Sequence, residues 1–211
     1  MTGWQGAKPV IGVVGAIGAG KSTVAAVLAA RGGAVVDADA LGHDALEQPE
    51  TRRQVLDRWG AQGNLLKPDG RIDRRTLAAI VFADPGERSV LEGLVFPYIG
   101  KRVLQAIAQA LADPAAKFVV VDAAVMIEAG WDGVCDRVIY VDAPRSARTM
   151  RVAARSGWTD AALAAREAAQ WPAEEKKKRA TAVVVNDAGP ERLEEQIDRL
   201  LEEWGYRNWS S

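Results

Sequence analysis

Residues 15–23, GAIGAGKST, constrain the fold of this chain more than any other stretch. They fit the pattern G-x-x-x-x-G-K-[ST] of a phosphate-binding loop, or P-loop. Its fixed positions are Gly15, Gly20, Lys21 and Ser22. The apolar run 10–14 before the loop predicts a buried strand, and residues 22–31 after it predict a helix. Strand, glycine loop and helix in this order are the setting in which such a loop folds.

The chemistry of this loop suits a nucleoside triphosphate. Its glycines let backbone N–H groups converge on the phosphates, and the helix N-terminus adds positive potential. In this motif Lys21 reaches the terminal phosphates, and the Ser22 hydroxyl binds Mg²⁺. The motif alone does not define what is done with the nucleotide.

The composition excludes several other classes of protein. The chain has 211 residues, and its net charge of −1 gives no basic footprint for nucleic acid. The first nine residues, MTGWQGAKP, lack the apolar segment of a signal peptide, and no apolar run approaches the roughly 18 residues of a membrane span. The single cysteine, Cys135, cannot form an internal disulfide, and we expect it to be a packed apolar residue. These features predict a cytoplasmic protein.

Four other β-branched runs predict further strands. They are GAVVDA (33–38), FVVVDA (118–123), RVIYVDA (137–143) and TAVVVND (181–187). Apolar runs without alternation indicate strands that are covered on both faces, as in a parallel sheet. Helical segments separate the runs, so the predicted fold is α/β, a doubly wound parallel sheet of the P-loop NTPase type.

Aspartates lie at or just after the ends of these predicted strands. In open parallel sheets, ligands bind outside the carboxyl ends of the strands. Asp37, Asp39, Asp122 and Asp142 are therefore expected on or near the edge that holds the loop. The alternative is that some of them are helix caps or turn residues, which we favour for Asp142 because Pro144 follows it closely.

The chain is predicted to be one domain, 1–211, whose core carries two helical insertions. The core segments are 9–39, 117–144 and 180–205. The first insertion, 40–116, is too long for a single crossover helix. Its helices are expected at 50–60, 73–82, 85–95 and 97–112. The second, 145–179, is rich in arginine and breaks at Ser156-Gly157, so we expect a mobile lid there, whereas the last helix, 190–204, should pack on the core.

This organisation suits a kinase of a small molecule. One insertion would hold the acceptor, and the other would close over ATP and exclude water. The Asp-Ala-Asp sequence at 37–39 supports this interpretation, because an acceptor hydroxyl needs a carboxylate that takes its proton. One of the two aspartates would face the hydroxyl and the other the metal. The alternative is that they cap a following helix.

Four segments, taken in order, resemble the dephospho-CoA kinase family, whose members phosphorylate dephospho-CoA in the last step of coenzyme A synthesis. They are VVDADALGHD (35–44), GRIDRRTLAAIVFADP (70–85), VVVDAAVMIEAGWDGVCDRVIYVDAP (119–144) and AAQWPAEEKKKRATAVVVNDAG (168–189). Together with the loop, the resemblance covers nearly the whole chain. It implies a kinase that uses ATP and Mg²⁺ and acts on dephospho-CoA. From the composition we expect no membrane or nucleic-acid partner, and we expect a monomer or weak homo-oligomer.

The resemblance also implies roles for particular residues. Asp39 is the general base on the ribose 3′-hydroxyl, and Arg155 joins Lys21 in stabilising the transferring phosphoryl group. The residues implied for ATP are Gly15, Gly18, Ala19, Gly20, Lys21, Ser22, Thr23 and Asn186, with Ser22 also on the metal. Arg74 and Glu128 are implied for the acceptor, and Asp37 and Asp122 are further candidates for the acceptor site from their place at the predicted strand ends.

Three positions depart from the family pattern in the region implied for the acceptor. His43 stands where the family usually has arginine, Phe96 where it often has histidine, and Ala124 where it has proline. His43 is either a pH-dependent contact or a solvated helix residue. Two other functions stay open on the sequence: a P-loop kinase of another small metabolite, of nucleoside or shikimate type, and a non-catalytic ATP-binding module.

Overall fold

The computed structural model describes residues 8–206. The expectation about a signal peptide therefore falls mainly on residues outside the described range. The chain divides into two compact units, with boundaries after Asp37 and after Leu104. No helix of the described part is long and apolar enough to cross a bilayer.

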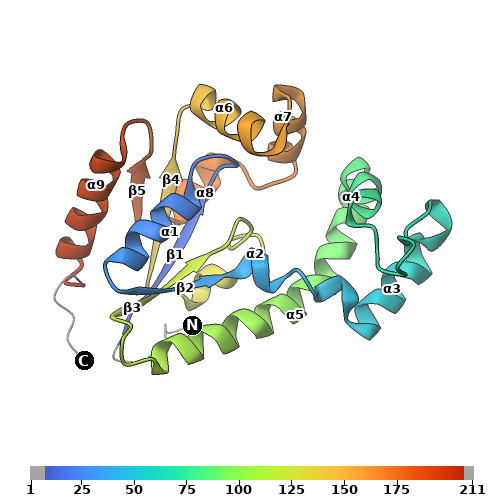
Figure 1. Cartoon of the computed structure of the whole chain (residues 1–211), viewed down its shortest axis with the longest axis horizontal. Coiled ribbons are helices and arrows are strands. Elements are labelled where there is room, and N and C mark those ends of the chain that lie inside the picture. The colour runs from blue at the N-terminus through green and yellow to red at the C-terminus, as the bar shows by residue number, and fades with distance from the viewer. Residues whose placement is uncertain (1–7, 207–211) are drawn as a thin grey trace. The chain divides into compact units, whose positions relative to one another are not determined.

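The first unit contains a sheet of five parallel strands in the order β2-β3-β1-β4-β5 (Figure 1). The strands are β1 (Val10–Gly15), β2 (Gly33–Asp37), β3 (Phe118–Asp122), β4 (Arg137–Asp142) and β5 (Ala182–Val185). Every residue of β1 is buried, as are the first four of β3. The predicted α/β fold and all five predicted strands are confirmed.

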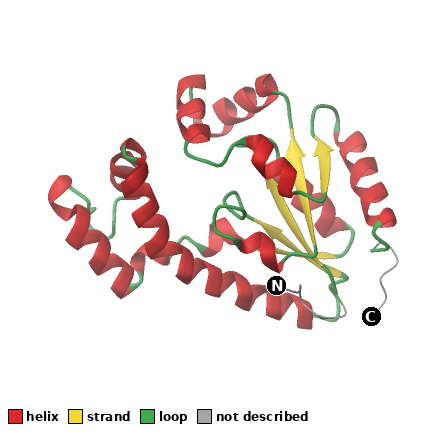
Figure 2. Cartoon of the chain, turned by 180° about the vertical axis from the view of Figure 1, so that it is seen from behind, coloured by secondary structure: helices red, strands yellow, loops and turns green. Residues whose placement is uncertain are grey.

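Helices cover both faces of this sheet (Figures 1 and 2). Helices α1 (Lys21–Ala30) and α9 (Pro190–Glu203) pack on one face, where Leu28 and Ile197 meet Ile139 in a common core. Tyr140 points to the opposite face because neighbouring side chains alternate along a strand. There α8 (Ala173–Arg179) places the Lys177 ammonium 5.5 Å from the centre of the Tyr140 ring. The predicted packing of the last helix is confirmed.

The segment after β4 forms α6 (Arg145–Ser156), α7 (Asp160–Ala168) and then α8. The predicted break is confirmed: Gly157 ends α6 with φ +66°, and Thr159 caps α7 by accepting the Ala162 N–H at 3.2 Å. A second break before α8 was not predicted, and Pro172 stands there at the N-cap position. Val152 and Leu163 are buried and anchor the first two helices.

The second unit is built from helices around its own small core. These are α2 (Ala38–Leu41), α3 (Pro49–Trp59), α4 (Arg74–Ala83) and most of α5 (Pro85–Ala112). Trp59 is fully buried among Val55, Leu77 and other apolar residues, and its indole N–H donates to Glu87 at 2.7 Å. A buried indole needs such a partner, so this bond fixes the ring.

Helix α5 corrects one sequence prediction. We expected two helices, 85–95 and 97–112, separated at the proline, but Pro97 lies inside one continuous helix. A proline inside a helix removes one backbone hydrogen bond and costs about 3 kcal/mol. Packing of apolar residues on both sides of Pro97 offsets this cost, since the partly buried Leu91 packs against the second unit's core and Ile107 is fully buried.

Close packing at Gly12 requires a glycine in the middle of β1. An added Cβ there would lie 2.6 Å from Met126 Sδ and 3.0 Å from Cys135 Sγ. Burial raises the pKa of the Cys135 thiol to about 12, so the thiol stays protonated at neutral pH. This agrees with the predicted packing role of the cysteine.

We expect Gly12→Ala to lower the free energy of unfolding by about 1–3 kcal/mol, because the added methyl group overpacks a filled core. Gly133→Ala is the matched control in the same unit. Gly133 lies in the short 3-10 helix Trp131–Val134, and its added Cβ would meet nothing within 4 Å. Urea unfolding of both variants measures the difference, and equal effects would contradict this account of Gly12.

Candidate active site

The phosphate-binding loop joins β1 to α1 at the carboxyl edge of the sheet (Figure 1). Gly18 and Gly20 have φ values of +76° and +99°, a region that side chains rarely adopt, so both positions need glycine. Within the described residues, no acceptor is bonded to the N–H groups of Gly18, Gly20 or Ser22. The first turn of α1 contains no acidic residue. Donors and helix dipole are therefore available to an anion.

Two predicted ATP-site residues differ in their surroundings. Ser22 is exposed in the first turn of α1, where its hydroxyl can be reached by a metal. Asn186 is buried and faces the loop: its amide nitrogen donates to the Ala19 carbonyl at 2.8 Å. The close approach also explains Gly20, because a Cβ there would lie 2.1 Å from that nitrogen.

Acidic residues close three strands, as predicted, at the edge where the loop begins. Asp37 of β2 is in register with Asp122 of β3, and Asp142 ends β4. Asp142 has structural partners, since it accepts the Ala143 N–H at 3.0 Å and pairs with Lys177 at 3.0 Å. The pair raises the pKa of Lys177. The turn role that we favoured for Asp142 agrees with these contacts.

Glu128 forms a buried ion pair in the first unit. Its carboxylate lies 2.7 Å from the Lys176 ammonium, and the two side chains are 9% and 2% exposed. Lys176 also donates to the Ala124 carbonyl at 3.2 Å, and Glu128 accepts the Trp171 N–H at 3.1 Å. The pair joins α8 to the loop after β3, a structural role that the family resemblance did not indicate.

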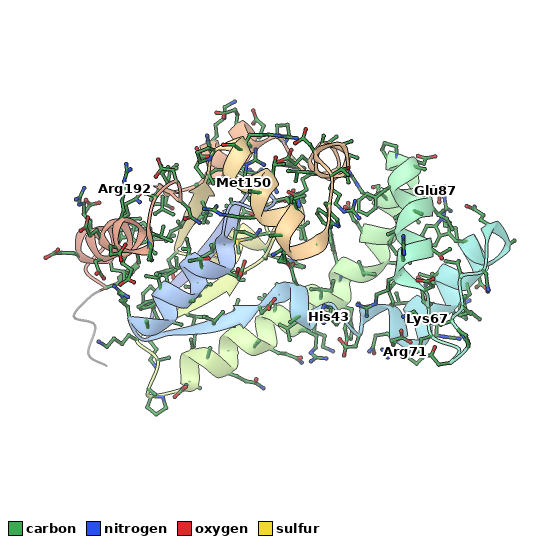
Figure 3. The ribbon with its side chains drawn as sticks, turned by 45° about the horizontal axis from the view of Figure 1, so that its top comes forward. His43, Lys67, Arg71, Glu87, Met150 and Arg192 are labelled. Atoms are coloured by element: carbon green, nitrogen blue, oxygen red, sulfur yellow. The ribbon has the colours of Figure 1, made fainter. Side chains whose placement is uncertain are left out.

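A cavity of about 550 Å³ lies within the second unit. Its lining includes four cationic side chains, Lys67, Arg71, Arg74 and Arg102, against two carboxylates, Asp44 and Glu47. Figure 3 shows Lys67 and Arg71 close together on this unit. Two of the cations are held by the carboxylates: Arg102 lies 3.2 Å from Asp44, and Arg71 lies 3.5 Å from Glu47. The excess of positive charge suits a phosphorylated ligand.

Several predicted residues lie in or near this cavity. Arg74 and His43 line it, and Ala40, which follows Asp39 in α2, does so too. His43 is exposed and lines the cavity, so its surroundings permit the ligand contact as well as the solvated role. The hydrogen bond from the Tyr98 hydroxyl is the largest of several contacts that hold the pKa of Asp44 below its usual value; the positive charge of Arg102 adds to it.

Some residues of the site were missed from the sequence. Lys67 and Arg71 come from one turn before α4, where the Lys67 N–H donates to the Arg71 carbonyl at 2.8 Å, and Arg102 comes from α5. No pattern in the sequence joins these two segments. Arg151 was missed as well, although it donates to the Ala19 carbonyl of the loop at 3.1 Å. Its signal was the i, i+4 spacing to Arg155, which puts both on one face of α6. Arg155 itself is exposed in the last turn of that helix.

The profile of the dephospho-CoA kinase family matches residues 9–191. A dephospho-CoA kinase from Anaeromyxobacter dehalogenans is 42% identical over 194 residues, which span 91% of this chain and 90% of that protein. Another, from Thermus thermophilus, is 39% identical over 194 residues, with 92% and 91% covered.

Solved structures are also similar to this chain over most of its length. A crystal structure from Thermus thermophilus is similar with a TM-score of 0.76 and 37% identity, covering 93% of this chain and 97% of that one. A dephospho-CoA kinase from Campylobacter jejuni has a TM-score of 0.66 and 26% identity, with the same coverage. A shikimate kinase from Acinetobacter baumannii, with a TM-score of 0.52 and 15% identity, shows a likeness of fold alone.

The buried ion pair of Glu128 and Lys176 leads to a prediction about stability. Glu128→Gln keeps an oxygen for the Trp171 N–H but leaves the Lys176 charge uncompensated, and Lys176→Met leaves the carboxylate uncompensated. Each single variant should lose about 3–5 kcal/mol of unfolding free energy, and the double variant should lose clearly less than the sum. Urea unfolding of the four proteins measures this coupling. Strictly additive losses would contradict the ion pair.

Proposed function

This chain belongs to the dephospho-CoA kinase family, and we propose how its own residues carry out the phosphoryl transfer from ATP to dephospho-CoA. The observation that supports this proposal best is the glycine loop with unbonded N–H groups at the edge of a parallel sheet. The product is coenzyme A, the end product of this biosynthetic route. In the proposal the enzyme works in the cytoplasm as a monomer or weak homo-oligomer.

ATP binds with its phosphates in the loop. The N–H groups of Gly18, Gly20 and Ser22 donate to phosphate oxygens, and Lys21 neutralises the terminal phosphates. Mg²⁺ supplies further charge neutralisation when bound. The fit of this chain to Mg²⁺ is good, because the ion usually takes only one or two protein ligands and the exposed Ser22 hydroxyl offers one.

Asp39 removes the proton from the ribose 3′-hydroxyl of dephospho-CoA. Both Asp37 and Asp39 are exposed, on either side of the buried Ala38, so their carboxylates are accessible to ligands. A carboxylate at the attacking hydroxyl orients it and accepts its proton during transfer. Asp37 instead faces the metal and contributes to the acceptor site.

The basic cavity of the second unit binds the diphosphate of the acceptor. Dephospho-CoA carries this group between its adenosine and pantetheine parts, and arginine donors bind phosphate oxygens in pairs. Arg74 and the neighbouring cations of the cavity supply those donors. Arg155 stabilises the charge that spreads over the transferring phosphoryl group, as an arginine in the lid of a kinase does.

Release of ADP from ATP-Mg²⁺ with a panel of acceptors tests the function. The panel contains dephospho-CoA, shikimate and nucleosides, and the Lys21→Ala variant controls for a contaminating kinase. Release that depends on dephospho-CoA is the expected result. Release with another acceptor would instead select a kinase of a different metabolite, and no release with any acceptor would select an ATP-binding module.

We expect Asp39→Asn to lower kcat by about 10²–10⁴-fold, because asparagine has nearly the same shape but cannot accept the proton. Binding of ATP should stay close to that of the wild type. Asp37→Asn is the matched comparison, and it should raise the Mg²⁺ concentration needed for activity more than it lowers saturated turnover. Steady-state kinetics over a Mg²⁺ series measures both. Identical effects of the two changes would refute this division of roles.

We expect Arg74→Gln to raise KM for dephospho-CoA about 10–100-fold, because a charged hydrogen bond to the diphosphate is lost. Arg75→Gln is the matched control: Arg75 follows it on α4 and is also exposed, but it does not line the cavity. KM for ATP should be unchanged in both variants. A similar rise for both arginines, or a rise in KM for ATP instead, would argue against this cavity as the acceptor site.

A further inference from the structure

The back of the phosphate-binding loop is held by two side chains from outside the loop. When backbone N–H groups of a loop face a ligand, the carbonyl groups of the same peptides point away and need donors of their own. Arg151 of α6 donates to the carbonyls of Gly18 at 3.3 Å and Ala19 at 3.1 Å. Asn186 adds a second donor to Ala19 at 2.8 Å. Two consecutive carbonyls of the loop therefore have side-chain donors.

Arg151 also ties the loop to the end of the sheet. Its second terminal nitrogen donates to the Asn186 carbonyl at 3.0 Å, and the Asn186 N–H donates to the Asp142 carbonyl at 2.8 Å. The guanidinium group thus connects α6, the loop and the residue after β5. No carboxylate pairs with Arg151 within residues 8–206, so its positive charge at the back of the loop is not neutralised by an acidic side chain.

The helix that carries Arg151 sits directly against the loop. An added Cβ on Gly18 would lie 2.9 Å from the Arg148 carbonyl and 3.0 Å from Val152, which is buried. Arg148 makes a longer contact of 3.5 Å with the Ile17 carbonyl. Because β4 leads into α6 at this edge of the sheet (Figure 1), the contact is built into the chain connection.

We propose that Arg151 is a positioning residue for ATP binding, acting through the loop backbone rather than on the nucleotide. Its hydrogen bond holds the Ala19 carbonyl outward, which keeps the Gly20 N–H of the same peptide turned toward the phosphates. Its bond to the Gly18 carbonyl fixes the preceding peptide, whose Ala19 N–H donates to the Ala16 carbonyl within the loop at 3.1 Å. A cation bonded to the Ala19 carbonyl also polarises the peptide that carries the Gly20 N–H and makes it a stronger donor. The inference rests on the proposed function in one respect: ATP is the ligand of this loop.

Arg151→Gln and Arg151→Lys test the proposal. Glutamine removes the charge and the paired donors, and kcat/KM for ATP should fall about 10–100-fold, as expected for lost hydrogen bonds to a charged group. Lysine keeps the charge but cannot bridge Ala19 and Asn186 with a planar fork, so its loss should be intermediate. KM for dephospho-CoA should stay unchanged in both.

The control is Arg192→Gln on α9 (Figure 3), because this exposed arginine lies away from the loop contacts of Arg151 and pairs with Asp187 at 3.4 Å. Direct titration with ATP-Mg²⁺ and thermal unfolding without ligand accompany the kinetics. The positioning role is supported if ATP binding weakens while the melting temperature stays unchanged, in Arg151→Lys alone or in both Arg151 variants. Wild-type ATP affinity in both Arg151 variants, or a loss that is explained by a lower melting temperature, overturns it.

Asn186→Ala provides a second variant if the glutamine variant does not fold. It removes the other donor to the Ala19 carbonyl but leaves the Arg151 charge in place, so ATP affinity should fall less than in Arg151→Gln. Failure of the proposed function has a separate signature, because the wild-type chain would then itself not bind ATP-Mg²⁺.

Discussion

The structure of the first unit depends on three glycines that allow other segments to approach the phosphate-binding loop. A Cβ on Gly15 would lie 2.5 Å from the Val141 carbonyl, and a Cβ on Gly20 would lie 2.1 Å from the amide nitrogen of Asn186. A Cβ on Gly18 would lie 2.9 Å from the Arg148 carbonyl of α6. The strand β4, the helix α6 and the end of β5 therefore converge on the loop because it lacks side chains there. The same lack of side chains frees its backbone for phosphate.

The five parallel strands bring acidic groups to the same edge, where they serve different purposes. Asp142 is bound to Lys177 and to the backbone, which makes it a structural residue of the turn. Asp37 is exposed beside Asp122 in the register of β2 and β3. A parallel sheet explains why aspartates meet at this edge, but the identity of the chemically active ones depends on which helices supply partners.

The fold was predictable where the determining residues are near one another in the sequence. Uninterrupted apolar runs identified the strands. Gly157 marked a helix end in the sequence because glycine readily adopts the positive φ that ends α6. The helix break predicted at Pro97 was wrong. A proline disfavours a helix locally, but the packing of Leu91 and the burial of Ile107 along α5 outweigh that local cost. The break before α8 was missed because the arginine-rich and lysine-rich segment around Pro172 reads as continuous helix.

The same distinction applies to the candidate site. The loop motif is local, so its place between a strand and a helix was predicted, whereas the pairing of Glu128 with Lys176 joins positions 48 residues apart. The two surfaces that we propose for phosphate binding also differ in kind. The loop uses backbone donors, which any sequence with the right glycines provides, and the cavity uses long cationic side chains that carboxylates hold in place. A side-chain surface of this kind can be assembled from any segments that meet in space, so only the structure reveals it.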